Sequence, residues 1–298
     1  MPIKIKVAII GAGPAGMSAA LQLKRYGIDF VLLERDSNGS LLKNAWRVEN
    51  YLGNQASSGL KMLAKFREHL ALNAIEPQYE TVTNLDFDNL QNVFQVETNK
   101  NKYIAEIVFV ASGTRPKTLA QLDNLAKDLA PYVLFEVFPL LNCHAKKVLI
   151  LGAGDAAFDN ALNLSELQNE IYIINRSAKI NTLPKLYAAA MQNKSISYLT
   201  DHTLQSINSG LQTNLICTFL HNGAAAIFNV DYLLVAIGRI AEKSFYNKAL
   251  SQQEARLISE QKLYLIGDVA NNSFRQVSIA IGEGMKAAMQ IGLLGFRS

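Results

Sequence analysis

The chain has 298 residues, of which 49% are hydrophobic, and 29 Lys and Arg against 25 Asp and Glu give it a net charge of +4. This composition excludes a disordered chain and predicts a globular protein of two domains. The basic residues are scattered, so we expect no nucleic-acid partner. Without an apolar run of membrane-spanning length or a signal-peptide pattern, we expect no membrane partner and a cytoplasmic location.

Residues 6–34, KVAIIGAGPAGMSAALQLKRYGIDFVLLE, predict a strand, a glycine turn, a helix and a second strand. In such a βαβ unit Gly11 permits the tight turn, Gly13 lets the backbone approach a pyrophosphate, and Gly16 lets helix and strand pack closely. Glu34 ends the second strand, where a carboxylate accepts hydrogen bonds from ribose hydroxyls. The agreement of all these features predicts a dinucleotide site and not an ordinary glycine turn.

Residues 146–177, KKVLILGAGDAAFDNALNLSELQNEIYIINRS, repeat this pattern. A strand at Val148–Leu151 leads into a turn with Gly152 and Gly154, a helix, and a strand at Ile171–Ile174. The third small residue is Ala157, a position where the dinucleotide fingerprint is less strict. The repeat predicts an α/β fold with two Rossmann-like dinucleotide-binding domains.

Near the C-terminus, a strand ending at Gly267 and Asp268 precedes a helix rich in small residues. Taken alone, Asp268 is also consistent with a helix cap. The two cysteines, Cys143 and Cys217, are far apart in the chain and predict neither a disulfide framework nor a metal site. The four histidines show no metal-ligand spacing, so we expect no metal.

Seven motifs carry a family resemblance, in this order: GAGPAG (11–16), RVENYLG (47–53), ASGTRPK (111–117), GAGDAAFD (152–159), AIGR (236–239), IGDV (266–269) and RQVSIAIGEG (275–284). Together they resemble the FAD-dependent pyridine nucleotide-disulfide oxidoreductases, most closely the low-molecular-weight thioredoxin reductases. The resemblance implies a discontinuous FAD domain, residues 1–116 and 243–298, with an NAD(P)H-binding-like domain, residues 117–242, inserted into it. It also implies a homodimer.

The resemblance further implies which residues bind the cofactors. It places Asp268 at the ribityl-pyrophosphate region of FAD and Asn50 near the isoalloxazine ring. The full set expected for FAD is Gly11, Gly13, Pro14, Ala15, Gly16, Glu34, Leu42, Asn50, Gly113, Gly267, Asp268, Arg275, Gln276 and Val277. The set expected for the nicotinamide nucleotide is Gly152, Gly154, Asp155, Ala156 and Arg176.

The family's catalytic Cys-x-x-Cys is missing. When the family pattern is aligned through KKVLILGAG, the positions of its two cysteines are occupied here by Phe135 and Phe138. Cys143, five positions further on, cannot form the pair alone, and Cys217 lies in an apolar strand-like segment typical of a buried, inert thiol. We expect no catalytic side chain. Phe135 and Phe138 are candidates for residues that lie beside the flavin. The alternative interpretation is that both side chains only fill volume in the core.

The nicotinamide nucleotide site also departs from the family pattern HRRxxxR, whose arginines grip the 2′-phosphate of NADPH. The corresponding residues are 175–181, NRSAKIN, which keep only Arg176. No carboxylate ends the preceding strand, so the feature that favours NADH is missing too. Arg176 therefore favours NADPH over NADH. A solvated surface arginine is the alternative.

These observations predict a flavoenzyme that passes electrons from NAD(P)H through FAD directly to an external acceptor. Other members of this fold that lack the cysteine pair include the thioredoxin reductase-like ferredoxin or flavodoxin-NADP reductases. By that likeness we expect a small redox protein such as ferredoxin or flavodoxin as acceptor. The alternatives are an atypical thioredoxin reductase-like flavoprotein that does not use NAD(P)H, and a flavin-binding module that does not turn over.

Overall fold

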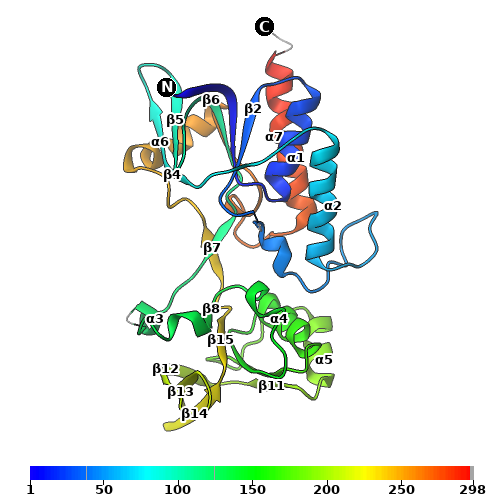
Figure 1. Cartoon of the computed structure of the whole chain (residues 1–298), viewed down its shortest axis with the longest axis vertical. Helices are drawn as coiled ribbons and strands as arrows, with labels where there is room; N and C mark the ends of the chain where they lie inside the picture. The colour runs from blue at the N-terminus through cyan, green and yellow to red at the C-terminus, as the bar shows by residue number, and fades with distance from the viewer. Residues whose placement is uncertain (38, 124, 296–298) are drawn as a thin grey trace. The chain divides into compact units, whose positions relative to one another are not determined.

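A computed structural model describes residues 1–37, 39–123 and 125–295 (Figure 1). The chain forms two compact units. Unit 1 contains residues 1–43, 49–115 and 240–298, and unit 2 contains residues 44–48 and 116–239. At their boundaries, β7 (Thr114–Pro116) and β16 (Arg239–Ala241) pair as a two-stranded sheet.

A mostly parallel sheet forms the centre of unit 1. Its path is β3-β2-β1-β6-β5-β4, with β17 also paired to β6. The strands are β1 (Ile3–Ile10), β2 (Phe30–Glu34), β3 (Gln78–Tyr79), β4 (Val82–Asp88), β5 (Val93–Thr98), β6 (Lys102–Val110) and β17 (Leu263–Leu265). In the parallel part, Ile10 aligns with Leu33 and Val110, and Val110 aligns with Leu265. The carboxyl ends of four strands therefore lie at one sheet edge, where α/β folds bind ligands.

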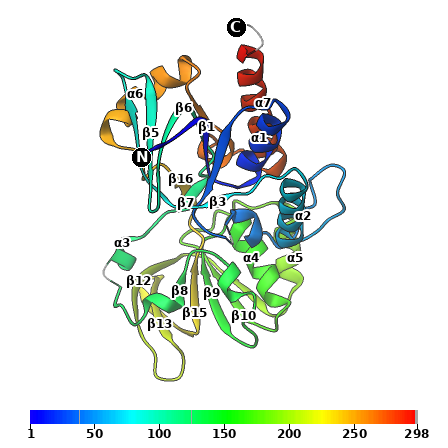
Figure 2. The ribbon, with the colours of Figure 1, turned by 45° about the horizontal axis from the view of Figure 1, so that its top comes forward.

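The helices of unit 1 are α1 (Pro14–Arg25), α2 (Gly59–Leu72), α6 (Lys248–Ser259) and α7 (Val277–Gly295). Figures 1 and 2 show α1 and α7 side by side, although they come from opposite ends of the chain. Small residues permit this approach, because a Cβ atom at Gly284 of α7 would lie 2.1 Å from the Ala15 carbonyl oxygen of α1. The Ser18 hydroxyl also donates to the Ile281 carbonyl oxygen across 2.8 Å.

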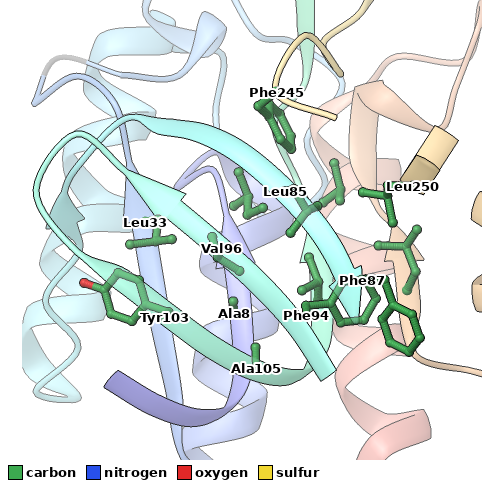
Figure 3. Close-up of a cluster of buried hydrophobic side chains, with 14 of the residues drawn as sticks. Ala8, Leu33, Leu85, Phe87, Phe94, Val96, Tyr103, Ala105, Phe245 and Leu250 are labelled. Atoms are coloured by element: carbon green, nitrogen blue, oxygen red, sulfur yellow. The ribbon is translucent and has the colours of Figure 1, made fainter. Parts of the chain in front are cut away.

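A buried apolar cluster packs against one face of this sheet (Figure 3). Ala8 and Leu33 come from the parallel strands, Phe87 and Phe94 from β4 and β5, and Leu250 from α6. The Phe87 and Phe94 rings meet edge to face with centroids 4.8 Å apart. This packing fixes the parallel strands, and with them the sheet edge described above.

Unit 2 contains a second parallel sheet of order β11-β10-β9-β15-β8 and an antiparallel sheet of order β12-β13-β14. Its strands are β8 (Val133–Leu134), β9 (Lys147–Leu151), β10 (Glu170–Ile174), β11 (Ile196–Leu199), β12 (His202–Ser209), β13 (Leu215–His221), β14 (Ala224–Val230) and β15 (Tyr232–Val235). Its helices are α3 (Ala120–Asp123), α4 (Asp155–Ser165) and α5 (Pro184–Gln192). Leu151 aligns with Ile174 and Val235, so unit 2 repeats the strand arrangement of unit 1. In the part of the chain that the structure describes, no helix is long and apolar enough to cross a membrane.

Candidate functional site

The first glycine turn lies between β1 and α1, at the carboxyl edge of the sheet of unit 1. Gly11 has a φ of +108°, and a Cβ atom there would lie 2.4 Å from the carbonyl oxygen of Ala111. A Cβ atom at Gly16 would lie 2.0 Å from the carbonyl oxygen of Gly11. Both positions therefore require glycine, for the turn and for the close contact of helix and strand respectively.

Gly13 faces open space. It is the N-cap of α1, and Pro14 and Ala15 follow it in the first turn. Of the described residues, only Ser40 would have an atom within 4 Å of a Cβ atom at Gly13, its hydroxyl oxygen at 3.9 Å. Among the described residues, no side chain caps the first amide groups of this helix, which carry partial positive charge. The turn therefore fits an anionic group such as a pyrophosphate.

Glu34 ends β2 beside this turn. One carboxylate oxygen accepts from the Ala12 amide across 2.8 Å, and the other accepts from the Asp36 amide across 3.3 Å. A carboxylate has about four acceptor positions, and the described residues fill two of them, which leaves positions for further donors such as ribose hydroxyls. The arrangement fits the role expected of Glu34 in binding a ribose.

The Gly267 and Asp268 turn follows β17 at the same sheet edge. Gly267 has a φ of +76°, and a Cβ atom there would lie 2.9 Å from the Cβ of Ala15. Asp268 belongs to a short 3-10 helix, Gly267–Val269, and α7 begins only at Val277. Asp268 therefore does not cap α7. Its turn packs against the first turn of α1.

The structure brings together two other residues expected near the flavin. The Asn50 side-chain amide donates to the side-chain oxygen of Gln276 across 2.9 Å, and both residues are exposed. Next to Gln276, the Arg275 Nε donates to the Asn271 carbonyl oxygen across 2.9 Å. Of the remaining predicted residues, Leu42 is buried in a 3-10 turn, whereas Gly113 has a φ of +70° and open space around it.

The second glycine turn, in unit 2, resembles the first. Gly152 has a φ of +126°, and a Cβ atom there would lie 2.3 Å from the Ala236 carbonyl oxygen. Gly154 is the N-cap of α4, and a Cβ atom there would meet only the Asn181 carbonyl oxygen, at 3.8 Å. The neighbouring Asp155 accepts from the Leu183 amide across 2.8 Å, which holds the segment after β10 beside the turn.

Arg176 follows β10 and is exposed, as is Ala156 in the first turn of α4. Among the residues that the structure describes, Arg176 has neither a hydrogen-bond nor an ion-pair partner. Its guanidinium is therefore available to a phosphate, although the same exposure fits a solvated surface residue.

The segment at the place of the missing cysteine pair is held by polar contacts within unit 2. Phe135 is partly buried and packs against an apolar cluster that contains Leu149. Glu136 forms an ion pair with Arg239 at 2.8 Å and accepts a hydrogen bond from the Asn44 side chain. Asn44 in turn accepts from the Phe138 amide across 3.1 Å. The contacts of Phe135 fit the core-filling reading.

Neither cysteine replaces the missing pair, since both are free. Cys217 is fully buried, and burial raises the pKa of its thiol to about 12, so it stays protonated and unreactive at neutral pH. The predicted burial of this thiol is confirmed, and its inertness stays a prediction. Cys143 is partly buried, with its sulfur 4.0 Å from the Tyr232 hydroxyl.

Asp159 in α4 is a partly buried carboxylate of unit 2. Burial raises its pKa to about 6, although a hydrogen bond from the Trp46 amide, 2.9 Å long, acts in the opposite direction. The negative charge of Asp155 on the same helix also raises this pKa. The surroundings of Asp159 therefore disfavour the ionised form of its carboxyl group relative to the protonated form.

The sequence reasoning missed the residues that hold these segments in place. Glu283 of α7 binds the Gly267 amide and the Asn271 side chain, and Glu136 pairs with Arg239. Glu283 gives one local signal, because it is an acidic residue in an otherwise apolar and small-residue stretch, SIAIGEGM. The pairing of Glu136 with Arg239 has no local signal, since 103 positions separate the two residues.

Comparison with known proteins agrees with this geometry. Residues 5–284 match the family model of the pyridine nucleotide-disulphide oxidoreductases. A thioredoxin reductase of Bacillus subtilis (strain 168) is 25% identical over 295 residues, covering 96% of this chain and 93% of that protein. A thioredoxin reductase of Helicobacter pylori (strain J99) is also 25% identical, over 312 residues that cover 96% of this chain and 97% of that protein.

Solved structures show the same fold. The Lactococcus lactis thioredoxin reductase has a TM-score of 0.84 at 22% identity, covering 96% of this chain and 97% of that one. The T. acidophilum thioredoxin reductase has a TM-score of 0.82 at 23% identity, covering 98% and 99%. The predicted α/β fold with two dinucleotide-binding domains is confirmed.

The chain belongs to the pyridine nucleotide-disulphide oxidoreductase family, and its fold is that of the thioredoxin reductases. The expected resemblance is thereby confirmed, as is the expected class of enzyme, an FAD-dependent oxidoreductase that uses NAD(P)H. FAD and NADPH are the cofactors of the thioredoxin reductases. The first glycine turn and its neighbours fit a dinucleotide such as FAD, since in the described part of the chain they combine an open helix N-terminus with a carboxylate that accepts only two hydrogen bonds.

Proposed function

We propose that this protein is an NADPH-dependent FAD oxidoreductase that delivers electrons from the flavin directly to an external acceptor, without a cysteine relay. When both cofactors are bound, NADPH supplies a hydride to FAD, and the reduced FAD supplies two electrons, which pass to one two-electron acceptor or to two molecules of a one-electron acceptor. The protein contributes binding and orientation, and no side chain acts as a nucleophile.

The observation that carries this proposal is the segment at residues 135–138. Thiol–disulfide exchange needs an attacking thiolate and a second sulfur that resolves the mixed disulfide. Phe135 and Phe138 supply neither, and Glu136 between them is paired with Arg239. The two cysteines of the chain are unpaired, and Cys217 is buried and protonated. Direct transfer from the flavin is the route that these residues leave.

The residues of unit 1 expected to bind FAD fall into four groups. Gly11, Gly13 and the first turn of α1 receive the pyrophosphate, Glu34 receives a ribose, and the Asp268 turn receives the ribityl end. Asn50, Arg275 and Gln276 orient the flavin ring. This assignment is supported by the open face at Gly13 and by the contact between Asn50 and Gln276.

In unit 2, Gly152 and Gly154 receive the pyrophosphate of NADPH at the N-terminus of α4. The exposed Arg176 reads the 2′-phosphate, so the preference for NADPH over NADH depends on one guanidinium. The supporting features are the open N-cap at Gly154 and the absence of a carboxylate at the end of β10.

The acceptor belongs to the class of small redox proteins, which the relatives named thioredoxin reductase also indicate. Within that class we propose ferredoxin or flavodoxin, acceptors that take electrons without disulfide exchange. Their acidic surfaces suit a chain with a net charge of +4. We also propose a homodimer and a cytoplasmic location.

An anaerobic mixing experiment tests the proposal. NADPH is added to the FAD-loaded protein in a stopped-flow instrument, and flavin absorbance is followed before ferredoxin, flavodoxin or thioredoxin is added. We expect rapid bleaching by NADPH, followed by recovery with ferredoxin or flavodoxin and none with thioredoxin. An unchanged spectrum after NADPH would contradict the proposal and support a protein that does not use NAD(P)H.

A further inference from the structure

Glu283 holds two segments of unit 1 with one carboxylate. Its Oε2 accepts from the Gly267 amide across 2.6 Å, and its Oε1 accepts from the Asn271 side-chain amide across 2.8 Å. The side chain of Asn271 also donates to the Gly267 carbonyl oxygen across 3.0 Å. Glu283, on α7, therefore ties the turn after β17 to the loop that precedes the helix.

Only a carboxylate satisfies both of these donors. Each oxygen of Glu283 receives an N–H group, and an ionised carboxylate accepts on both oxygens. A glutamine could accept from one donor only, and its own NH2 group would face the other. The Asn271 side chain could accept from that NH2 group only if its amide were flipped. The flipped amide would place its oxygen against the Gly267 carbonyl oxygen, and the hydrogen bond that Asn271 now donates there would be lost. The pattern of donors thus selects glutamate at this position.

The two segments that Glu283 joins carry residues assigned to FAD. Gly267 precedes Asp268, and its α-carbon packs against Ala15, next to the first glycine turn. The Asn271 carbonyl oxygen accepts from Arg275, which fixes the start of the loop that reaches Gln276. Displacing Glu283 would therefore disturb two sets of expected FAD contacts together, those to the ribityl chain and those to the flavin ring.

We propose that Glu283 is a positioning residue for FAD. Its carboxylate sets the distance between the Asp268 turn and the loop with Arg275 and Gln276, so that both meet one FAD molecule without rearrangement. Preorganisation of this kind raises affinity, because the segments are ordered before the ligand arrives. The inference rests on the proposed function, in which these segments bind FAD.

The test is FAD binding by the apoprotein of the full chain, measured by the change in flavin fluorescence. Glu283→Gln keeps the shape of the side chain and removes one acceptor. We expect it to raise the Kd for FAD by about tenfold or more, the loss typical of a donor left without its partner. The matched control is Glu106→Gln, an exposed glutamate of β6 in the same unit whose carboxylate is paired with Lys6. We expect the control to leave the Kd unchanged.

A double-mutant cycle with Asn271→Ala distinguishes positioning from simple damage. Without the Asn271 amide, a glutamine at 283 can still accept from Gly267, so Glu283→Gln should cost far less FAD affinity in this background than in the wild type. The melting temperature of each apoprotein separates loss of folding from loss of binding. An unchanged Kd in Glu283→Gln, or an equal loss in both backgrounds, would overturn the inference. Wild-type protein that binds no FAD would instead overturn the proposed function.

Discussion

The Asn50 side chain donates a hydrogen bond to the Gln276 side chain across 2.9 Å, although 226 positions separate the two residues in the chain. The bond joins the motif RVENYLG to the motif RQVSIAIGEG, the two segments in which flavin-ring contacts are expected. Both residues are exposed, so their remaining hydrogen-bonding groups are available to a ligand. The contact gives a physical basis for predictions about the cofactor.

Gly13→Val should abolish FAD binding without unfolding the protein. The backbone of Gly13 is extended, with a φ of −78°, so valine is tolerated there. Its side chain would occupy the open space in which the pyrophosphate is expected. The measurement is flavin absorbance of the purified protein and its recovery after FAD is added. Gly282→Ala is the control, because this exposed glycine of α7 also has no atom within 4 Å of an added Cβ. A yellow Gly13→Val protein would show that the pyrophosphate lies elsewhere.

Arg176→Ala should erase the preference for NADPH over NADH. We expect kcat/KM with NADPH to fall roughly tenfold to a hundredfold, since a charge-assisted contact to the 2′-phosphate is lost. The value with NADH should change little. Lys194→Ala, an exposed cation elsewhere in unit 2, is the control for a general effect of charge. The same preference in wild type and Arg176→Ala would assign this residue to the solvated surface.

The double variant Cys143→Ala with Cys217→Ala should reduce ferricyanide with NADPH at nearly the wild-type rate. Neither protein should reduce thioredoxin, because no pair of sulfurs can carry out the exchange. Replacing Cys217 removes a buried sulfur from the core, so the melting temperature should be measured in parallel. Efficient thioredoxin reduction that disappears in the double variant would mean that one of these thiols acts as a relay.

Asp159→Asn should stabilise the protein at pH 7.5 and have little effect near pH 4. Burial raises the pKa of Asp159 from 3.8 to about 6, so the folded state binds the proton more tightly than the unfolded chain. The contribution of Asp159 to stability therefore falls as the pH rises from about 4 to about 6, whereas asparagine does not titrate and can still accept from the Trp46 amide. The gain above pH 6 should be on the order of 1 kcal/mol, below the upper limit of about 3 kcal/mol set by the shift. Denaturant titrations at both pH values measure it, and an equal effect at both would contradict the assignment.

The sequence predicted the glycine turns well, because their constraints are local. Gly11, Gly16 and Gly152 lie where the backbone needs a positive φ or where a side chain has no room. The fold class followed from the repetition of one βαβ pattern. The residues that fix the loops could not be predicted in this way, since Glu136 and Arg239 meet only after the chain has folded. The inclusion of residues 44–48 in unit 2 had no signal in the sequence either, because it depends on side-chain contacts with distant segments.

The number of electrons that the protein stores tests the central claim most directly. An anaerobic titration of the FAD-loaded protein with dithionite, followed by flavin absorbance, counts the reducing equivalents taken up per FAD. A flavin without a redox-active disulfide takes up two electrons, whereas a flavin with such a disulfide takes up four. We predict two electrons per FAD, and the same number in the double cysteine variant. An uptake of four electrons in the wild type that falls to two in the variant would contradict direct transfer from the flavin.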